Sequence, residues 1–161
     1  MRHLILLVAP LVIASLASAQ SIPSPIGGTR VNHVARGQFT VKLLPLAMEG
    51  QPEGEKLGRM SINKTISGDL VAVTTGQMLS AMTNVEGSAS YVAIERVEGS
   101  LHGKKGSFVL QHSGTMNRGV SNLLVTVVPD SGTDELVGIS GELKITIVKG
   151  KHSYEFSYSL Q

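Results

Sequence analysis

The sequence predicts an exported, single-domain all-β protein, and three observations support this fold class. Short runs rich in Val, Ile, Thr and Tyr recur between glycine-containing turns, a pattern typical of antiparallel strands in a sandwich or barrel. No stretch shows the apolar periodicity of an amphipathic helix. Without an N-terminal export signal of 19 residues, 142 residues remain, which is enough for one well-packed domain and too few for a second.

Residues 1–19 have the layout of a cleavable secretory signal. Residues 1–3 are a basic start, residues 4–16 form an apolar run, and the Ala-Ser-Ala of residues 17–19 is a small-x-small cleavage site. The apolar run is broken by Pro10 and is shorter than the ~20 residues of a membrane-spanning helix. We therefore expect cleavage after residue 19, no membrane span in the mature chain, and a periplasmic or extracellular location.

Composition excludes several classes of function. The chain has no cysteine, and its formal charge of +2 falls to +1 when Arg2 leaves with the signal. Disulfides and thiol chemistry are therefore absent. The basic residues are scattered, which argues against a nucleic-acid partner. No Walker-type, dinucleotide-binding or G-x-S-x-G pattern occurs, so we expect no cofactor. His33, His102 and His152 have no companion at metal-ligand spacing, so we expect no metal.

The mature chain divides into a leader and a domain. Residues 20–36 begin with a stretch rich in Pro, Ser and Gly, which predicts a flexible leader. Residues 37–161 are expected to form the β domain. Two polar segments in it, 113–119 and 129–135, carry turn-forming residues and are predicted connectors that would also suit the mouth of a barrel.

The last two strands are predicted to form a hairpin around Gly150-Lys151. Glycine in the first turn position suits the type II′ geometry that matches strand twist. This register pairs Ile147 with Tyr154 and Ile145 with Phe156, and it leaves charged and small polar residues on the opposite face. We therefore expect one buried face made by Leu143, Ile145, Ile147, Tyr154, Phe156 and Tyr158.

Two further hairpins follow from the same reasoning. A turn at Ser67-Gly68 pairs Ile62 with Val73. A turn around Gly103-Lys104 places Glu95 directly opposite His112. The face shared by that pair also carries Phe108 and Leu110, so a carboxylate and an imidazole are predicted to lie side by side on an inward face.

The predicted pair of Glu95 and His112 is the candidate catalytic feature. Cross-strand partners lie ~5 Å apart, within hydrogen-bonding reach for these side chains. A neighbouring carboxylate raises the basicity of an imidazole and fixes its tautomer, as in proton-transfer catalysts. A mutually satisfied polar pair with no catalytic role is the more common outcome, because perturbed ionisable pairs mark function only statistically.

Three separated segments resemble the bacterial family catalogued as domain of unknown function 3224. They are GSASYVAIERVEG at 87–99, GSFVLQH at 106–112 and VPDSGTDEL at 128–136, and the likeness runs from about residue 37 to residue 160. That family resembles the allene oxide cyclase barrels. The resemblance implies a closed antiparallel barrel of about eight strands with an interior cavity, and it implies no particular activity.

Three functions remain open at this stage. The first is binding of a small apolar or amphipathic molecule in a barrel interior lined by Tyr91, Glu95, Phe108, Leu110, His112, Tyr154 and Tyr158. The second is a cofactor-independent isomerase or cyclase that uses His112 as base or acid and Glu95 to orient it. The third is a filled barrel that acts as a structural protein or homo-oligomer through outward apolar residues such as Val92 and Ile94.

Overall fold

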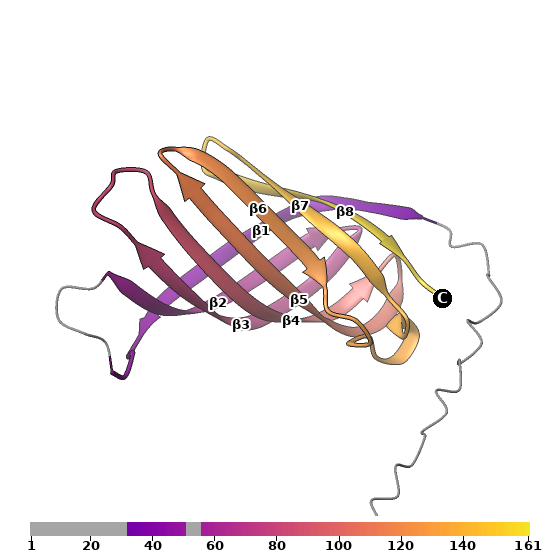
Figure 1. Cartoon of the computed structure of the whole chain (residues 1–161). Helices are drawn as coiled ribbons and strands as arrows, with labels where there is room; N and C mark the ends of the chain where they lie inside the picture. Colours follow the sequence, from indigo (N-terminus) through magenta and orange to yellow (C-terminus); the bar gives the residue numbers. More distant parts are fainter. Residues whose placement is uncertain (1–31, 51–55) are drawn as a thin grey trace, which may run out of the picture.

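The computed structural model describes residues 32–50 and 56–161, which form one closed antiparallel barrel (Figure 1). Each strand pairs with its neighbours in sequence, and the last strand returns to the first. The strands are β1 (His33–Leu46), β2 (Leu57–Gly68), β3 (Leu70–Met82), β4 (Ala89–Leu101), β5 (Lys104–Asn117), β6 (Val120–Val127), β7 (Ser140–Val148) and β8 (Lys151–Ser159). The predicted barrel is confirmed, whereas the likeness to allene oxide cyclases stays a prediction.

The N-terminal boundary of the barrel lies earlier than the sequence indicated. Strand β1 begins at His33 and pairs with β8 from that residue onward, inside the segment predicted as leader. The predicted export signal and the rest of the leader lie outside the described residues. Within the described ranges, no helix is long and apolar enough to cross a membrane.

Alternation of side chains along each strand separates an inner face from an outer face. In β4, residues 93, 95, 97 and 101 are buried, and the even-numbered residues from 90 to 98 are exposed. In β5, the residues Phe108, Leu110 and His112 are buried with the same two-residue period. This period of two is the one expected of a strand whose one face packs on a core.

Two hairpins turn one residue earlier than predicted, which moves their registers by two residues. The β4–β5 turn is His102-Gly103 and the β7–β8 turn is Lys149-Gly150, and all four residues have positive φ angles. Positive φ at both central positions defines a type I′ turn, in which glycine prefers the second place. The prediction of glycine in the first place was therefore wrong. Because the shift is even, every side chain keeps its predicted face.

The β2–β3 connection differs in a more consequential way. Its register pairs Ile66 with Ala72 and Lys64 with Thr74, not Ile62 with Val73 as predicted from a tight turn at Ser67-Gly68. Because Ile66 and Ala72 are the pair nearest the turn, residues 67–71 connect the paired parts of the two strands, which is longer than a two-residue turn. Gly68 still pairs with Gly37 of β1. The resulting shift is odd and reverses which β3 residues face inward: Val71 and Val73 lie outside and Thr74 lies inside.

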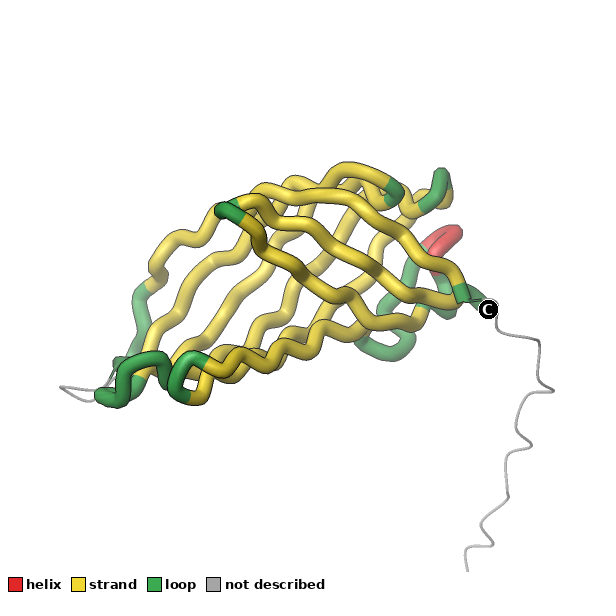
Figure 2. The backbone as a smooth tube through the Cα atoms, turned by 90° about the horizontal axis from the view of Figure 1, so that it is seen from above, coloured by secondary structure: helices red, strands yellow, loops and turns green. Residues whose placement is uncertain are grey.

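One end of the barrel is filled and sealed. The connection from β6 to β7 folds over that end and contains the short 3₁₀ helix η1 (Asp134–Leu136), drawn red in Figure 2. Leu136 and Ile139 are almost completely buried there. They join a core whose members include Leu70, Leu101, Phe108, Leu110, Phe156 and Tyr158. The polar segment 129–135 therefore belongs to the closed end and not to an open mouth.

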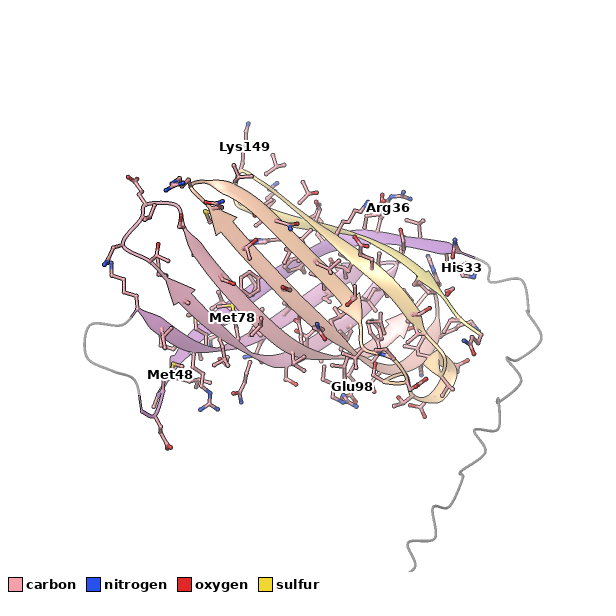
Figure 3. The ribbon with its side chains drawn as sticks, in the orientation of Figure 1. His33, Arg36, Met48, Met78, Glu98 and Lys149 are labelled. Carbon is pink, nitrogen blue, oxygen red and sulfur yellow. The ribbon has the colours of Figure 1, made fainter. Side chains whose placement is uncertain are left out.

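At the opposite end of the barrel, the described residues leave the lumen open to solvent. This end carries the connections β1–β2, β3–β4, β5–β6 and β7–β8, and Figure 3 labels His33 and Met48 near the opposite ends of β1. Ile147 faces the lumen at this end but is 61% exposed. The prediction of a buried face was thus correct for Tyr154, Phe156 and Tyr158 and wrong for Ile147, because the core does not extend to the open end.

Candidate functional site

A buried polar cluster lies in the middle of the barrel, between the filled end and the open end. Lys64 comes from β2, Thr74 from β3, Glu95 from β4 and His112 from β5. All four side chains face inward, and Glu95 is completely buried, with an exposed fraction of 0%. Four adjacent strands thus bring one carboxylate, one ammonium group, one imidazole and one hydroxyl into the same layer of the interior.

Glu95 is the centre of this cluster. Its Oε2 atom lies 2.5 Å from Nζ of Lys64 and 2.9 Å from Nε2 of His112. The hydroxyl of Thr74 donates a short hydrogen bond to Oε1 of Glu95. On β3, the residue paired with Glu95 is Gly76, where an added Cβ would lie 2.9 Å from the Glu95 Cα. Glycine at this position therefore lets β3 approach the backbone of β4 closely beside Glu95.

Electrostatics keep Glu95 ionised. Burial by itself raises the pKa of a carboxylic acid, because it disfavours the charged form. Contact with His112, the positive charge of Lys64 and the hydroxyl of Thr74 outweigh burial and hold the pKa of Glu95 below its ordinary value. The ammonium of Lys64 also lies 5.2 Å from the ring centroid of Phe39, which adds a cation–π contact.

His112 contacts Glu95 without a well-aligned hydrogen bond. The Nε2–Oε2 distance is short, yet the angle of the contact does not suit a hydrogen bond, and within the described residues Nε2 has no aligned partner. The strand register explains this geometry, because His112 pairs with Ala93 and Glu95 pairs with Leu110. The two side chains are diagonal neighbours. The predicted placement of Glu95 directly opposite His112 was wrong, but both share the inner face and meet.

An apolar cavity of about 370 Å³ lies at the open end of the barrel. Strands β3 to β7 supply its walls. Its main lining side chains are Met78, Ser80, Met82, Tyr91, Met116, Leu123 and Ile147. The cavity exists because these lumen-facing positions hold flexible or small side chains and lie beyond the packed core.

Tyr91 lies in the wall of this cavity. Its ring packs on Gly114, where an added Cβ would lie 2.3 Å from Cε1 of Tyr91. Burial, together with the negative charge of Glu95, raises the pKa of Tyr91 above its ordinary value. The phenol therefore stays protonated at neutral pH. Segment 113–119, considered above as a connector, supplies Gly114, Thr115 and Met116 to the same cavity.

The other predicted lining residues lie at the filled end. Phe108 stacks on Phe156 with ring centroids 5.6 Å apart, and Leu110 belongs to the same core. The hydroxyl of Tyr154 accepts a hydrogen bond from the backbone N–H of Leu70 at 3.0 Å. These positions contact core and backbone and do not line the cavity.

Tyr158 also packs at the closed end. Its hydroxyl lies 2.7 Å from Nδ1 of His102, and its ring stacks on Phe156 with centroids 5.2 Å apart. Of the seven residues predicted to line the lumen, the structure therefore brings together Glu95 and His112 in the cluster, and it places Tyr91 in the cavity beyond them.

Sequence reasoning missed Lys64 and Thr74. A signal for Lys64 was present, because Ile62 and Ile66 flank it at the two-residue spacing of one strand face. The signal for Thr74 was hidden, because the apolar residues Val71 and Val73 made the opposite face of β3 look like the core face. The methionines of the open end were also missed, since the sequence did not show where the core ends.

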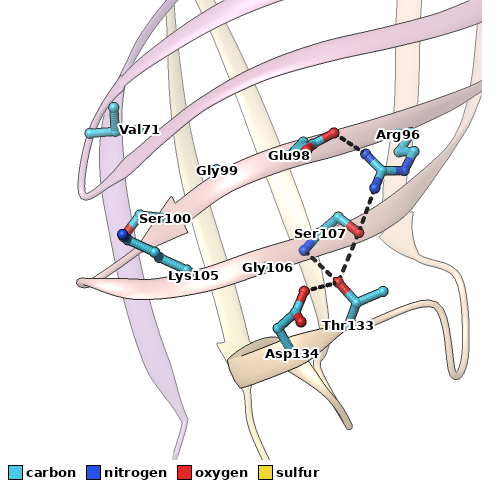
Figure 4. A pocket seen from close by; sticks show the side chains of 10 residues that line it. All are labelled: Val71, Arg96, Glu98, Gly99, Ser100, Lys105, Gly106, Ser107, Thr133 and Asp134. Carbon is cyan, nitrogen blue, oxygen red and sulfur yellow. Dashed lines mark hydrogen bonds and ion pairs between the residues drawn. The ribbon is translucent and has the colours of Figure 1, made fainter.

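A second cavity, on the outer surface near the closed end, is polar and internally satisfied (Figure 4). Arg96 contacts Glu98 at 2.5 Å and donates to Ser107 at 3.1 Å. The backbone N–H of Ser107 donates to the Thr133 hydroxyl, which donates to Asp134. These bonds hold the β6–β7 connection on β5, so the polar side chains of this groove have a structural role. In the described residues, no group of three or more His, Asp or Glu side chains is placed to hold a metal ion.

Comparisons with known proteins agree with this architecture. The sequence model of the family described as "Protein of unknown function (DUF3224)" matches residues 35–158. The crystal structure of a protein of unknown function from that family, from Shewanella oneidensis MR-1, is 48% identical with a TM-score of 0.77. The similarity covers 81% of this chain and 99% of the Shewanella chain. No curated protein matches.

Proposed function

The chain belongs to the DUF3224 family, and we propose that it is an exported barrel that binds a small apolar or amphipathic molecule in the open end of its lumen. The observation that carries this proposal is the cavity of about 370 Å³, a size within the ~300–1,000 Å³ range of small-molecule sites. A barrel of eight strands encloses room for side chains and for one small ligand.

The chemistry of the cavity wall supports an apolar occupant. Met82, Met116, Leu123 and Ile147 all line the cavity and are all substantially exposed in the free protein. Apolar surface that is open to water and concave is favourable to cover, because burial gains ~25 cal/mol per Å². Methionine side chains adapt their shape to different ligands, so the wall suits a molecule without a rigid outline.

The buried cluster lies deeper in the barrel than this binding site and does not line it. Lys64, Glu95 and His112 are held by one another and are nearly inaccessible to solvent. Charges that compensate each other at fixed positions would keep the four strands β2 to β5 in one register below the cavity. The role of the cluster in this proposal is therefore to position the wall, with Tyr91 as the group nearest to the ligand.

A cofactor-independent isomerase or cyclase is the alternative that uses the same residues. It is favoured by the short contact between His112 and Glu95. Neither residue lines the apolar cavity of the lumen, and the groove that His112 borders is formed mainly by outer-face residues of β2 to β5. A catalytic base must reach within ~3 Å of the proton that it removes. Binding is therefore the function that the geometry supports better.

Association with a second copy of the chain is a separate alternative. Val71, Val73, Leu79, Val92 and Ile94 are exposed on the outer face of β3 and β4. Exposed apolar surface of this kind is typical of interaction sites. Light scattering of the wild type and of Ile94→Glu would detect a subunit interface as a fall in mass for the variant.

Binding is tested by titration with N-phenyl-1-naphthylamine, an uncharged apolar fluorophore. The blocking variant is Ile147→Glu, and its matched control is Val148→Glu. These neighbours are 61% and 60% exposed but face the lumen and the outside, respectively. We expect saturable fluorescence enhancement with the wild type and Val148→Glu, and at least tenfold weaker binding to Ile147→Glu. Equal binding to the two variants would contradict a site in the lumen.

A further inference from the structure

We infer that the lumen takes an uncharged molecule whose polar group accepts a hydrogen bond from the hydroxyl of Tyr91. This inference rests on the proposed function and specifies its ligand class. It excludes amphipathic molecules that enter with a carboxylate, phosphate or ammonium group first. Three features of the interior carry it: the neutral wall of the cavity, the compensated charges beneath it, and the free phenol in its side.

The wall of the cavity carries no formal charge among its described residues. All of the lining positions are Met, Ser, Ala, Tyr, Gly, Thr, Asn, Leu or Ile. A ligand carboxylate or ammonium group inside this space would lose its hydration shell without gaining an opposite charge. That loss costs several kcal/mol per ion, even after relaxation. An uncharged polar group loses far less, and a single hydrogen bond compensates for it.

The charges beneath the cavity are not available to a ligand. The only ammonium in the buried cluster belongs to Lys64, whose Nζ atom lies 2.5 Å from Oε2 of Glu95. An anionic ligand would have to separate Lys64 from Glu95, leaving a buried carboxylate without its cation. Neither Lys64 nor Glu95 lines the cavity. The cluster therefore does not create an anion site or a cation site for a ligand.

The hydroxyl of Tyr91 is an unused donor in the cavity wall, and it is carried by a ring whose place is set by packing on Gly114. Among the described residues, no hydrogen bond engages it, and the hydroxyls of Ser80 and Ser121 in the same wall are also unengaged and uncharged. The pKa of Tyr91 is raised by burial and by Glu95, so the phenol keeps its proton and acts as a donor. A ketone, ester or ether oxygen is the matching acceptor. The ligand class is therefore a small, mostly hydrocarbon molecule with one such oxygen.

The test compares three ten-carbon compounds with different head groups at pH 7. 2-Decanone, decanoate and decylammonium each compete with N-phenyl-1-naphthylamine for the wild-type protein, below their aggregation concentrations. We expect 2-decanone to displace the fluorophore at a concentration at least tenfold lower than either ion. Decanoate that competes as well as the ketone would overturn the inference while leaving the proposed function intact. If the fluorophore does not bind and no compound competes, both the inference and the proposed function are contradicted.

Two variants locate the discrimination at the cavity wall. Tyr91→Phe should weaken the binding of 2-decanone about fivefold more than it weakens the binding of the fluorophore, which is the value of one net hydrogen bond. Met116→Lys adds a cation at a lumen-facing position that is already partly exposed. We expect it to raise decanoate affinity at least fivefold and to weaken decylammonium. If both variants keep the wild-type order of affinities for the three compounds, the cavity wall does not discriminate between head groups, and the inference is overturned.

Discussion

At the scale of single residues, the interior is organised around Glu95. A fully buried carboxylate is tolerated because Lys64, Thr74 and His112 surround it. Such an arrangement contributes little net stability compared with an apolar core, but removing one partner is costly. The cluster therefore fixes the arrangement of strands β2 to β5 more than it increases the free energy of unfolding.

Lys64→Met should lower the free energy of unfolding by about 3–5 kcal/mol, because it leaves the charge of Glu95 buried without its cation. Adding Glu95→Gln to this variant should recover part of the loss. Urea denaturation of both single variants and the double variant measures the coupling. Arg96→Met, which disrupts the exposed pair with Glu98, is the control and should change stability by less than ~1 kcal/mol. Additive effects of the two buried substitutions would show that the pair is not coupled.

The pH dependence of stability should report the same carboxylate. The folded protein lowers the pKa of Glu95 below the ordinary value of 4.5, so the unfolded chain binds the proton more readily. Ionised Glu95 thus contributes stability above pH 4.5, and this contribution is lost as the pH falls through the lower folded pKa. The stability difference between wild type and Glu95→Gln should therefore be constant from pH 6 to 8 and shrink below pH 4.5. Glu98→Gln, at an exposed position, serves as control. A difference that widens in acid would mean that folding raises the pKa of Glu95.

Single positions were predictable where strand periodicity decided them. The inward faces of Glu95, His112 and Tyr91 followed from alternation alone, and an even error in register did not move them. Thr74 was not predictable in this way, because the outer residues of β3 are more apolar than its inner ones. A lumen-facing residue can contact the apolar core, the buried polar cluster or the cavity. Which of these it contacts depends on which end of the barrel is closed, and local sequence does not specify that.

At the scale of elements, the β6–β7 connection closes one end of the barrel. Strands β6 and β7 share one bridged residue pair, Thr126 with Glu142. The connection instead bonds to β5, where Thr133 donates to the carbonyl of Ser107 and accepts from its N–H. Segment 129–135, predicted as a polar connector, therefore seals one end of the barrel together with η1. Among the described residues, the other end is the opening into the lumen.

Leu136→Ala should lower the free energy of unfolding by about 2–5 kcal/mol, the usual cost of truncating a buried leucine. The matched control is Val137→Ala, one residue further along the same turn, where the side chain is 62% exposed. That substitution should change stability by less than ~0.5 kcal/mol. Thermal and urea unfolding of both variants would check this. Equal effects at the two positions would show that Leu136 does not plug the core.

The hairpin turns show what local sequence does and does not determine. Lys149-Gly150 and His102-Gly103 were recognisable as turns, because glycine tolerates the positive φ that they require. The position of glycine within the turn was not recognisable, since types I′ and II′ both use it. The turn type, which only the structure shows, determines the registers of the β4–β5 and β7–β8 hairpins.

At the scale of the whole molecule, the barrel divides into a packed half and an open half. Aromatic and leucine side chains fill the end near η1, and methionines with small residues line the other end. The all-β class was predicted from the strand pattern, and the number of strands was implied by the family resemblance. The asymmetry between the two ends was not, because it arises from contacts between segments distant in sequence.

Export is the prediction that concerns the complete chain. Expression of the full sequence in a bacterial host should yield a mature protein that begins at Gln20, because residues 1–19 have a basic start, an apolar run and a small-x-small site. Intact-mass analysis of the periplasmic and extracellular fractions measures this. Recovery of the uncleaved chain of 161 residues from the cytoplasm alone would contradict it.

The most direct test of ligand binding in the lumen is methyl NMR of the protein labelled at its methionines, with and without N-phenyl-1-naphthylamine. Met78, Met82 and Met116 line the cavity, whereas Met48 does not and follows the end of β1. If the open lumen binds the fluorophore, the methyl signals of Met78, Met82 and Met116 will shift saturably and the Met48 signal will stay in place. Saturable binding that leaves those three signals unchanged would contradict a ligand site in the barrel.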